Sequence, residues 1–406
     1  MSVIKPFKGL KPTTSFIKKV VLNHLDNPFS QQNPQWLSNN PESFLHLLDP
    51  EIDVQKHESR FGNIIVKLKH FLQNHILERD HNASFYIYRV ILNNESATGI
   101  WTCTLLDDYL NGTIKKHEYT QPEKEHQLYQ FIQETGLDCI PVLITYEPNK
   151  AISSFIKDVT SNLPSLSFID DTNRKHDLWV IDQPENINFL KQQFKGLASV
   201  YIADGHHRAA AFSAYGLNRR KHNQRHNGSE EYNFCSSIYF AADELKIYSY
   251  SRLIKADLET HQVLDYIQKN FRLETVMVDC YYPKGKGEYG LWADGKWFKF
   301  NIPVKENDVD PVKKLDVSSL QDLFLSPVFG INDPRNDNRL GFAPGTHSCS
   351  VLMNKIKKEG YNYAITMFPV SVEELMSVAD SGGIMPPKST WFEPKMPLGL
   401  VTHFID

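Results

Sequence analysis

The sequence predicts a mixed α/β fold with more than one domain, and three observations lead to this prediction. The chain has 406 residues, which is more than a single hydrophobic core usually serves. Apolar and β-branched runs, such as 141–146, alternate with segments whose apolar residues recur at helical spacing, such as 128–132. At 200–212 an apolar run ends in Asp204-Gly205 and a helix-forming run follows at once, which is the order of a strand, a tight loop and a helix.

The same periodicities place the other elements along the chain. Helical spacing predicts helices at 57–80, 122–135, 186–195, 257–270 and 318–325. Apolar runs predict strands at 84–90, 99–105, 141–146, 178–181, 236–240 and 245–250, with short hairpin strands in 278–302. Thr120 and Glu123 have the spacing of a capping box, and Gly136 suits a helix C-cap. Residues 147–177 hold clusters of Ser, Asp and Asn, which predict a loop-rich segment.

Charge and composition argue against several classes of protein. The net charge is −4, so there is no general basic field that would hold nucleic acid. No apolar run reaches the length of a membrane span, and the first residues lack the apolar core of a signal peptide. The five cysteines lie far apart and are odd in number, which predicts reduced thiols in a cytoplasmic protein. No Cys-x-x-Cys occurs, so a structural zinc site is not expected.

The junction at 204–208 reads Asp-Gly-His-His-Arg and carries the most chemistry in the chain. A helix that begins here points free backbone N–H groups and its positive dipole end at the loop, and such a helix mouth can bind phosphate. Arg208 can hold a phosphate through two hydrogen bonds, and Asp204 can bind a metal ion or orient an imidazole. His206 and His207 can move protons near neutral pH. The alternative is an ordinary turn with surface histidines, but so many different polar groups at one junction favour function.

A second polar loop stands before the helix expected at 122–135. It contains His117, Glu118 and Thr120, side chains that can bind ligands or transfer protons. Taken alone, this loop fits a solvated surface segment better than a functional one, so its interpretation depends on what lies next to it.

A third segment, at 382–395, is unusual for its three prolines and two lysines. Prolines stiffen the backbone without giving it a ladder partner. A rigid loop that presents Lys388, Ser389 and Thr390 could hold a phosphate or a carboxylate. A proline-rich edge segment with no ligand is an equal alternative.

Several motifs occur in one order along nearly the whole chain. They lie at 5–12, 112–120, 202–208, 330–334 and 385–392. In this order they resemble the domain of unknown function 1015 family of bacterial proteins. One departure stands at 25–29, where the family often has a Pro-Tyr-Asp element and this chain has Leu-Asp-Asn-Pro-Phe.

The Asp-Gly-His-His-Arg loop also resembles the ParB/sulfiredoxin superfamily, in which a Gly-x-x-Arg loop at a helix start binds nucleotide phosphates. His206 stands where sulfiredoxin chemistry needs a cysteine, and the helix-turn-helix of ParB is not evident. The remaining branch is the free-serine kinases, which share this loop and use a glutamate at the place of Glu118. The resemblance implies an N-terminal mixed region at 1–99, a ParB/sulfiredoxin-like nucleotide-binding core at 100–245 with an insertion at 147–197, and a C-terminal mixed α/β region at 246–406 that closes the site.

This resemblance implies a phosphotransferase that interconverts free serine and phosphoserine, with ADP or ATP as the substrate nucleotide. The implied catalytic residues are Glu118, Asp204, His206 and His207. The implied phosphate- or nucleotide-binding residues are His117, Thr120, Gly205 and Arg208. The implied residues for the amino acid are Lys388, Ser389 and Thr390, and Asp204 would also hold Mg²⁺.

Two other functions fit the same residues. A nucleotide-binding switch, for CTP or ATP, would use the phosphate loop without transfer chemistry and would tolerate the loss of Glu118. A metal hydrolase could use His117, His206 and His207, but the chain lacks His-Glu-x-x-His spacing. The sequence leaves the nucleotide, the acceptor and the oligomeric state open.

Overall fold

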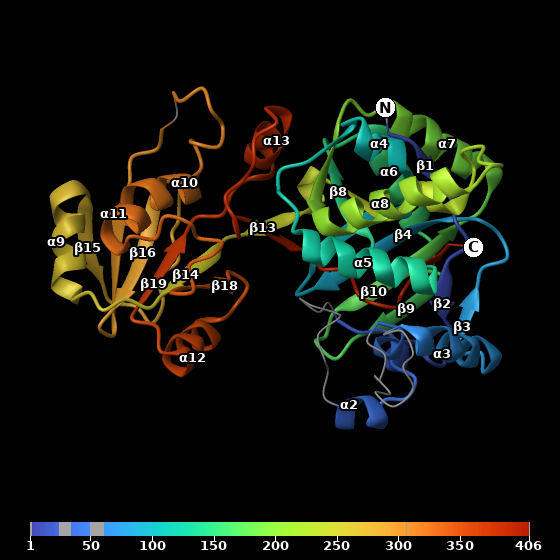
Figure 1. Cartoon of the computed structure of the whole chain (residues 1–406), viewed down its shortest axis with the longest axis horizontal. Helices are drawn as coiled ribbons and strands as arrows, with labels where there is room; N and C mark the ends of the chain where they lie inside the picture. The colour runs from blue at the N-terminus through green and yellow to red at the C-terminus, as the bar shows by residue number, and fades with distance from the viewer. Residues whose placement is uncertain (1, 24–33, 49–60, 306, 406) are drawn as a thin grey trace. The chain divides into compact units, whose positions relative to one another are not determined.

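A computed structural model describes residues 2–23, 34–48, 61–305 and 307–405 (Figure 1). Contacts divide the chain into two compact units. Unit 1 comprises Met1–Leu245 and Pro394–Asp406, and unit 2 comprises Lys246–Glu393. Helices and strands build both units, so the predicted mixed α/β class is confirmed. The three regions expected from the sequence stay a prediction. The departure from the family pattern at 25–29 lies outside the described residues.

Unit 1 is built on a mixed nine-stranded sheet. Its order is β6 (Ile114–Lys115), β11 (Val200–Asp204), β8 (Val142–Tyr146), β12 (Phe234–Ala241), β5 (Glu95–Leu105), β4 (Phe85–Leu92), β10 (Lys175–Ile181) and β9 (Leu166–Ile169), with β1 (Ile4–Lys5) also paired to β5. The β6–β11 and β8–β12 pairs are parallel and the others are antiparallel. Two small sheets complete the unit: β2 (Leu10–Pro12) with β3 (Leu77–Arg79), and β7 (Leu137–Asp138) with β21 (His403–Phe404).

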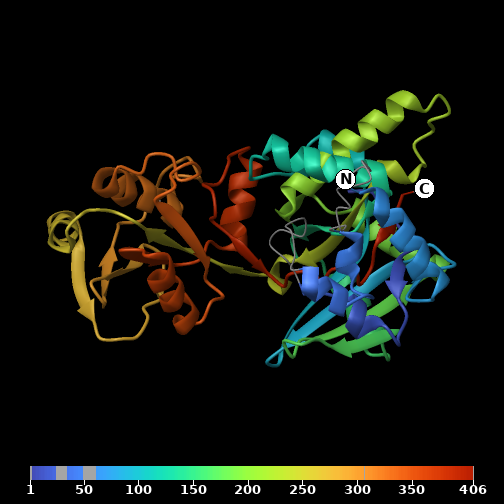
Figure 2. The same cartoon turned by 60° about the horizontal axis from the view of Figure 1, so that its bottom comes forward.

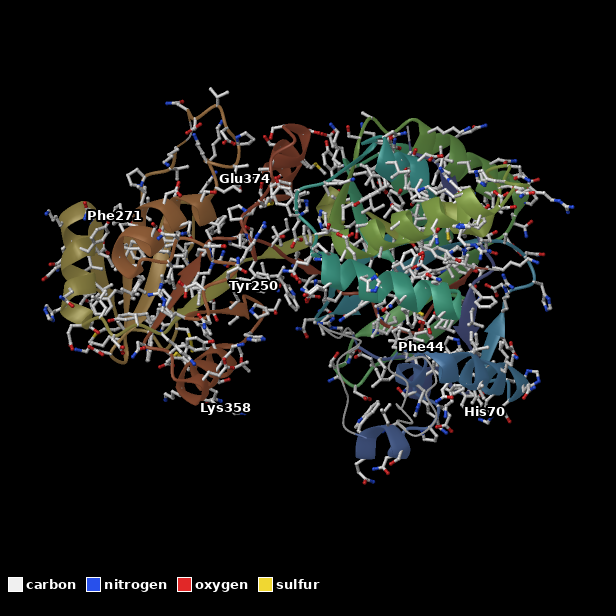
Figure 3. All side chains as sticks on the ribbon, in the orientation of Figure 1. Phe44, His70, Tyr250, Phe271, Lys358 and Glu374 are labelled. Atoms are coloured by element: carbon white, nitrogen blue, oxygen red, sulfur yellow. A yellow bond between two sulfur atoms is a disulfide. The ribbon has the colours of Figure 1, made fainter. Side chains whose placement is uncertain are left out.

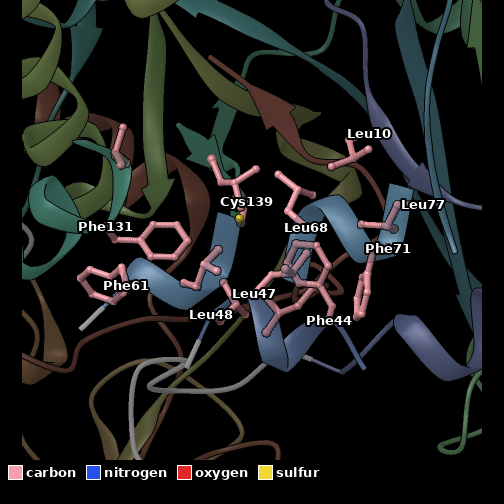
Figure 4. Close-up of a cluster of buried hydrophobic side chains, with 14 of the residues drawn as sticks. Leu10, Phe44, Leu47, Leu48, Phe61, Leu68, Phe71, Leu77, Phe131 and Cys139 are labelled. Carbon is pink, nitrogen blue, oxygen red and sulfur yellow. The ribbon is translucent and has the colours of Figure 1, made fainter. Parts of the chain in front are cut away.

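Helices cover this sheet and enclose two hydrophobic clusters. The helices are α1 (Ile17–Val20), α2 (Pro34–Asn39), α3 (Gly62–Gln73), α4 (Leu106–Leu110), α5 (Pro122–Thr135), α6 (Lys150–Thr160), α7 (Pro184–Lys195) and α8 (His206–His222), with short 3-10 turns at Phe44–Leu47, Glu231–Asn233 and Ala242–Glu244. Figures 1 and 2 show α5 beside α8. One cluster joins the sheet to α6 and α7, and the other joins α3, α5 and α8 to the N-terminal segment (Figure 4).

The segment 147–177 is not loop-rich, so that prediction is wrong. It contains α6 and β9 and the start of β10, which pairs with β4. Asn149 caps α6 by accepting hydrogen bonds from the N–H groups of Ala151 and Ile152. The polar residues that indicated a loop therefore include a helix N-cap, and the apolar spacing behind it begins at Ile152.

Two other local predictions also need correction. The helix expected at 57–80 is α3, and it ends at Gln73, because the residues just beyond it form strand β3 against β2; residues 57–60 lie outside the described residues. The capping box at Thr120 does not form, since α5 begins at Pro122 with Gln121 as an N-cap that makes no side-chain bond. The C-cap at Gly136 is confirmed, with a left-handed φ of 66°.

Unit 2 contains an antiparallel six-stranded sheet. Its order is β15 (Arg272–Val276), β17 (Lys296–Asn301), β16 (Glu288–Ala293), β19 (Tyr363–Met367), β14 (Tyr250–Ile254) and β18 (Leu340–Pro344). Its helices are α9 (Thr260–Asn270), α10 (Asp316–Leu320), a π turn at Gln321–Leu325, α11 (Ser326–Phe329), α12 (Cys349–Glu359) and α13 (Val372–Asp380). The chain enters and leaves this unit through β13 (Lys246–Tyr248) and β20 (Trp391–Glu393), which pair with each other.

A disulfide joins Cys280 to Cys349 in unit 2. The expectation that all five cysteines are reduced is therefore wrong. The other three, Cys103, Cys139 and Cys235, are free thiols. The odd count indicated free thiols, but it carried no information on which two cysteines the fold of unit 2 brings together.

A buried ionic cluster ties both ends of the chain into unit 1. The imidazole of His403 is 1% exposed, and its Nε2 lies 3.2 Å from Oε2 of Glu231. Glu231 also forms an ion pair with Lys5, whose Nζ lies 2.7 Å from Oε1 of Glu231. Oδ2 of Asp138 lies 3.9 Å from Nδ1 of His403. Burial alone would lower the pKa of His403, but its interactions with Cys103, Asp138 and Glu231 outweigh burial and raise the pKa well above its usual value.

We expect His403→Gln to lower the free energy of unfolding by about 3 kcal/mol at pH 5, because it removes one partner of a buried pair. A histidine whose folded pKa is raised stabilises the fold fully below its unfolded pKa, about 6.5, and loses this contribution as the pH rises through the folded value. Urea unfolding of wild type and variant at pH 5, 7 and 9 should show a shrinking difference. The exposed His70, labelled in Figure 3, provides a control as His70→Gln. A His403 effect that is constant across this pH range would contradict the assignment.

Candidate functional site

The parallel pairing of β6 with β11 assembles the candidate site. Lys115 stands opposite Tyr201 in this pair, so both strands end at the same edge of the sheet. The loop with His117 and Glu118 leaves β6 there, and α8 begins there after β11. Groups about 90 positions apart in sequence therefore become neighbours: Glu118 Oε2 lies 3.5 Å from Nδ1 of His206.

The turn between β11 and α8 requires glycine for two reasons. Gly205 has a φ of 103°, which residues with a Cβ rarely adopt. A Cβ at this position would also lie 2.7 Å from Nη2 of Arg208. Because Gly205 supplies no side-chain cap, the first backbone N–H groups of this 17-residue helix remain available to an anion.

The two buried histidines fix each other's position. The backbone N–H of His117 donates to Nε2 of His206 at 3.4 Å, so the neutral His206 ring carries its proton on Nδ1, the nitrogen that faces Glu118. The rings meet edge to face with centroids 4.4 Å apart. Burial lowers the pKa of His117 to about 4 and lowers the pKa of His206 well below its usual value. Both rings are therefore neutral at pH 7.

Two imidazole nitrogens at the site are buried without a hydrogen bond. Within the described part of the chain, Nδ1 of His117 and Nε2 of His207 have no hydrogen-bond partner. An unsatisfied buried polar atom costs free energy, so both nitrogens are suited to bind a ligand atom. The pKa of His207 is lowered by burial and by the nearby Lys124.

Asp204 lies between two cations. Its Oδ2 is 2.9 Å from the ammonium of Lys395, and its Oδ1 is 3.4 Å from Nη2 of Arg208. Arg208 also donates to the carbonyl of Pro141. Among the described residues, no three His, Cys, Asp or Glu side chains are grouped to hold a metal ion, and both Asp204 oxygens meet cations, so these residues do not fit a Mg²⁺ site.

Lys395 also lies at this site, although it is not among the site residues expected from the sequence. It stands in the proline- and lysine-rich block, but Lys388 was assigned there instead. Lys395 and Asp204 are separated by 191 positions, a distance at which spacing gives no signal. Only the return of Pro394–Asp406 to unit 1 places it here.

The loop with Lys388, Ser389 and Thr390 belongs to unit 2. Buried Arg252 holds it by donating from Nη1 to the carbonyl of Lys388 at 2.8 Å and from Nη2 to that of Pro387 at 3.3 Å. Lys388 has a left-handed φ of 55°. Its ammonium lies 5.2 Å from the centre of the Tyr250 ring.

Ser389 and Thr390 differ in how available they are. Ser389 is buried and its hydroxyl donates to the carbonyl of Pro386, whereas Thr390 is partly exposed. Thr120, in unit 1, is partly exposed just before α5. Lys388, by contrast, is exposed.

These features define a mixed α/β protein in which a polar helix mouth follows a strand and is bordered by carboxylates and cations. The model of the family described as "Protein of unknown function (DUF1015)" matches residues 4–318. The chain belongs to this family, as its motifs predicted. No curated protein matches the sequence, and among the described residues no helix combines the length and apolar composition that a bilayer span requires.

Several solved structures are similar to this chain, and three of them are described here. A conserved hypothetical protein from Pyrococcus furiosus is 12% identical, with 75% of this chain and 95% of that chain covered and a TM-score of 0.36. A mutant free serine kinase in complex with ADP is 15% identical, with 72% and 87% covered and a TM-score of 0.33. C-terminally truncated SbnI from Staphylococcus aureus is 12% identical, with 75% and 87% covered and a TM-score of 0.36. All three similarities are weak.

We expect Gly205→Ala to lower the free energy of unfolding by about 1–2 kcal/mol, the cost of a left-handed residue with a Cβ, and by more if Arg208 is displaced. Gly228 is a matched control, since its φ is 91° but nothing lies within 4 Å of its Cβ position. Urea unfolding should show a larger loss for Gly205→Ala than for Gly228→Ala. Equal losses would mean that the contact with Arg208 has no energetic weight.

Proposed function

We propose that this protein is a phosphotransferase that interconverts free serine and phosphoserine, with ADP or ATP as the phosphoryl partner. The observation that carries the proposal is the placement of Glu118 beside an uncapped helix mouth that also holds Arg208. The mouth offers hydrogen-bond donors for a phosphoryl group, and the carboxylate stands ready at its edge. The loop resemblance described above supports the same assignment.

The phosphate side of the site consists of the backbone N–H groups at 205–208 and the guanidinium of Arg208. These donors are fixed before a ligand arrives, because Gly205 sets the turn and Asp204 and Pro141 hold the guanidinium. Preorganised donors aimed at a transferring phosphoryl group are the usual basis of its stabilisation.

The acceptor side is assigned to Glu118. Its side chain is 47% exposed, so a serine hydroxyl can reach it. In the proposed step the serine Oγ forms a bond to phosphorus while the bond from phosphorus to the bridging oxygen of the nucleotide breaks. Glu118 accepts the hydroxyl proton, and the nucleotide leaves with the electron pair. The reverse reaction returns the phosphoryl group to the nucleotide.

The neutral histidines take a different part from the one their sequence suggested. Burial keeps His206 uncharged, so its Nδ1–H orients the Glu118 carboxylate rather than supplying positive charge. The nitrogens of His117 and His207 that lack a hydrogen-bond partner are proposed to bond to ligand atoms. The assignment of Lys388, in unit 2, to the carboxylate of the amino acid stays a prediction from the sequence.

We expect Arg208→Ala to weaken ADP binding by roughly 1.5–3 kcal/mol, the value of a charge-assisted hydrogen bond. Isothermal titration calorimetry measures this directly. Arg225, an exposed arginine of unit 1, gives the matched control Arg225→Ala, which should bind ADP as wild type does. An unchanged dissociation constant for Arg208→Ala would remove the loop from the site.

We expect Glu118→Gln to reduce turnover by about 10²–10⁴-fold, the usual contribution of a general base, with little change in ADP affinity. Phosphorus NMR on nucleotide plus serine, and on phosphoserine plus AMP or ADP, follows both directions. Glu134→Gln, at an exposed position of α5, is the control and should keep full turnover.

Two outcomes would change the assignment. If wild type binds nucleotide and transfers nothing in either direction, the protein is a nucleotide-binding switch rather than an enzyme. If Glu118→Gln keeps full turnover, another group accepts the proton.

A further inference from the structure

We infer that Lys395 is a second phosphate-binding cation of this site, held beside the helix mouth by Asp204. The inference rests on the proposed nucleotide site but not on the transfer of a phosphoryl group. The family model ends at residue 318, so the assignment comes from the fold and not from the matched region.

The local charge at Asp204 favours an anionic ligand. Two cationic side chains, Lys395 and Arg208, lie on opposite oxygens of one carboxylate. Two of these three side chains are cationic and one is anionic, so together they carry one net positive charge.

Both cationic side chains are largely buried. The side chain of Lys395 is 12% exposed and that of Arg208 is 18% exposed. Charges removed from water are screened less than surface charges, so each acts strongly on a nearby anion. The α8 N-terminus adds its own positive dipole end next to them. A phosphate group is the ligand that this combination favours.

Backbone hydrogen bonds of the following residues fix the position of Lys395. The N–H and carbonyl of Leu398 both bond to Leu22, and those of Thr402 both bond to Leu10. Strand β21 then pairs with β7. A lysine only three residues before the first of these anchors has a defined starting point for its flexible stem.

Arg208 and Lys395 are suited to different parts of phosphate binding. The guanidinium of Arg208 lies over Gly205 and bonds to Pro141, so it stays where the turn puts it. An ammonium on a four-carbon stem can rotate its donors and follow a moving charge. We assign Arg208 to the phosphate nearest the loop and Lys395 to the charge beyond it.

The test is calorimetric binding of ADP, inorganic pyrophosphate and adenosine to wild type, Lys395→Met and Lys395→Arg. We expect Lys395→Met to weaken ADP and pyrophosphate binding at least tenfold and to leave adenosine binding within twofold. Lys395→Arg, which keeps the charge, should recover most of the loss. Lys157, on the exposed surface of α6, gives the matched control Lys157→Met, and thermal unfolding checks that each variant is folded.

A double variant separates phosphate binding from a structural ion pair. If Lys395 only neutralises Asp204, then Asp204→Asn together with Lys395→Met should restore ADP affinity. If Lys395 binds phosphate, the double variant should stay at least tenfold weaker than wild type. A recovered affinity, or a wild-type dissociation constant for Lys395→Met, would overturn the inference even if serine phosphorylation is observed.

The binding readout also keeps this inference apart from the proposed reaction. Loss of ADP affinity in Lys395→Met supports the inference whether or not wild type transfers a phosphoryl group. Absence of any binding of ADP or pyrophosphate to wild type would overturn both.

Discussion

The short parallel pairing of β6 with β11 is the constraint on which the candidate site depends. It consists of two residue pairs, Ile114 with Val200 and Lys115 with Tyr201. Because the strands run the same way, the loops that follow them emerge at one edge. A slip of one residue would turn every side chain of β6 to the other face of the sheet, and His117 would lose its hydrogen bond to His206. The register of a very short strand thus sets the positions of the polar groups around the helix mouth.

The site divides its polar groups by burial. The inner layer, His117 and His206, is buried and uncharged, and it holds the geometry through hydrogen bonds. The outer layer consists of ion-paired side chains that are partly exposed, namely Asp204, Arg208 and Lys395. Ion pairs that keep some contact with water can exchange partners at a smaller cost than a fully buried charge, which is expensive without a partner. This arrangement suits a site that must admit and release a charged ligand.

What the sequence could predict follows the range of the interactions. The strand, turn and helix at 200–222 were predictable, because a glycine turn and two periodicities are local signals. Glu118 was connected to this loop by resemblance and not by spacing. The roles of Lys395 and His403 could not be predicted, since their partners lie far away in sequence. The segment 147–177 was misread because Asn149 favours both loops and helix N-caps.

The antiparallel pairing of β13 with β20 has a practical consequence for dissecting the protein. Lys246 and Glu393 are directly paired, and opposite residues of an antiparallel pair have Cα atoms roughly 4.5–5.5 Å apart. The two ends of unit 2 therefore start from almost the same point, so a few linking residues could replace the whole unit and leave the C-terminal segment attached. A simple truncation after Leu245 would behave differently. It would discard β21 together with His403, and expose Asp138 and Glu231 as carboxylates without their imidazole.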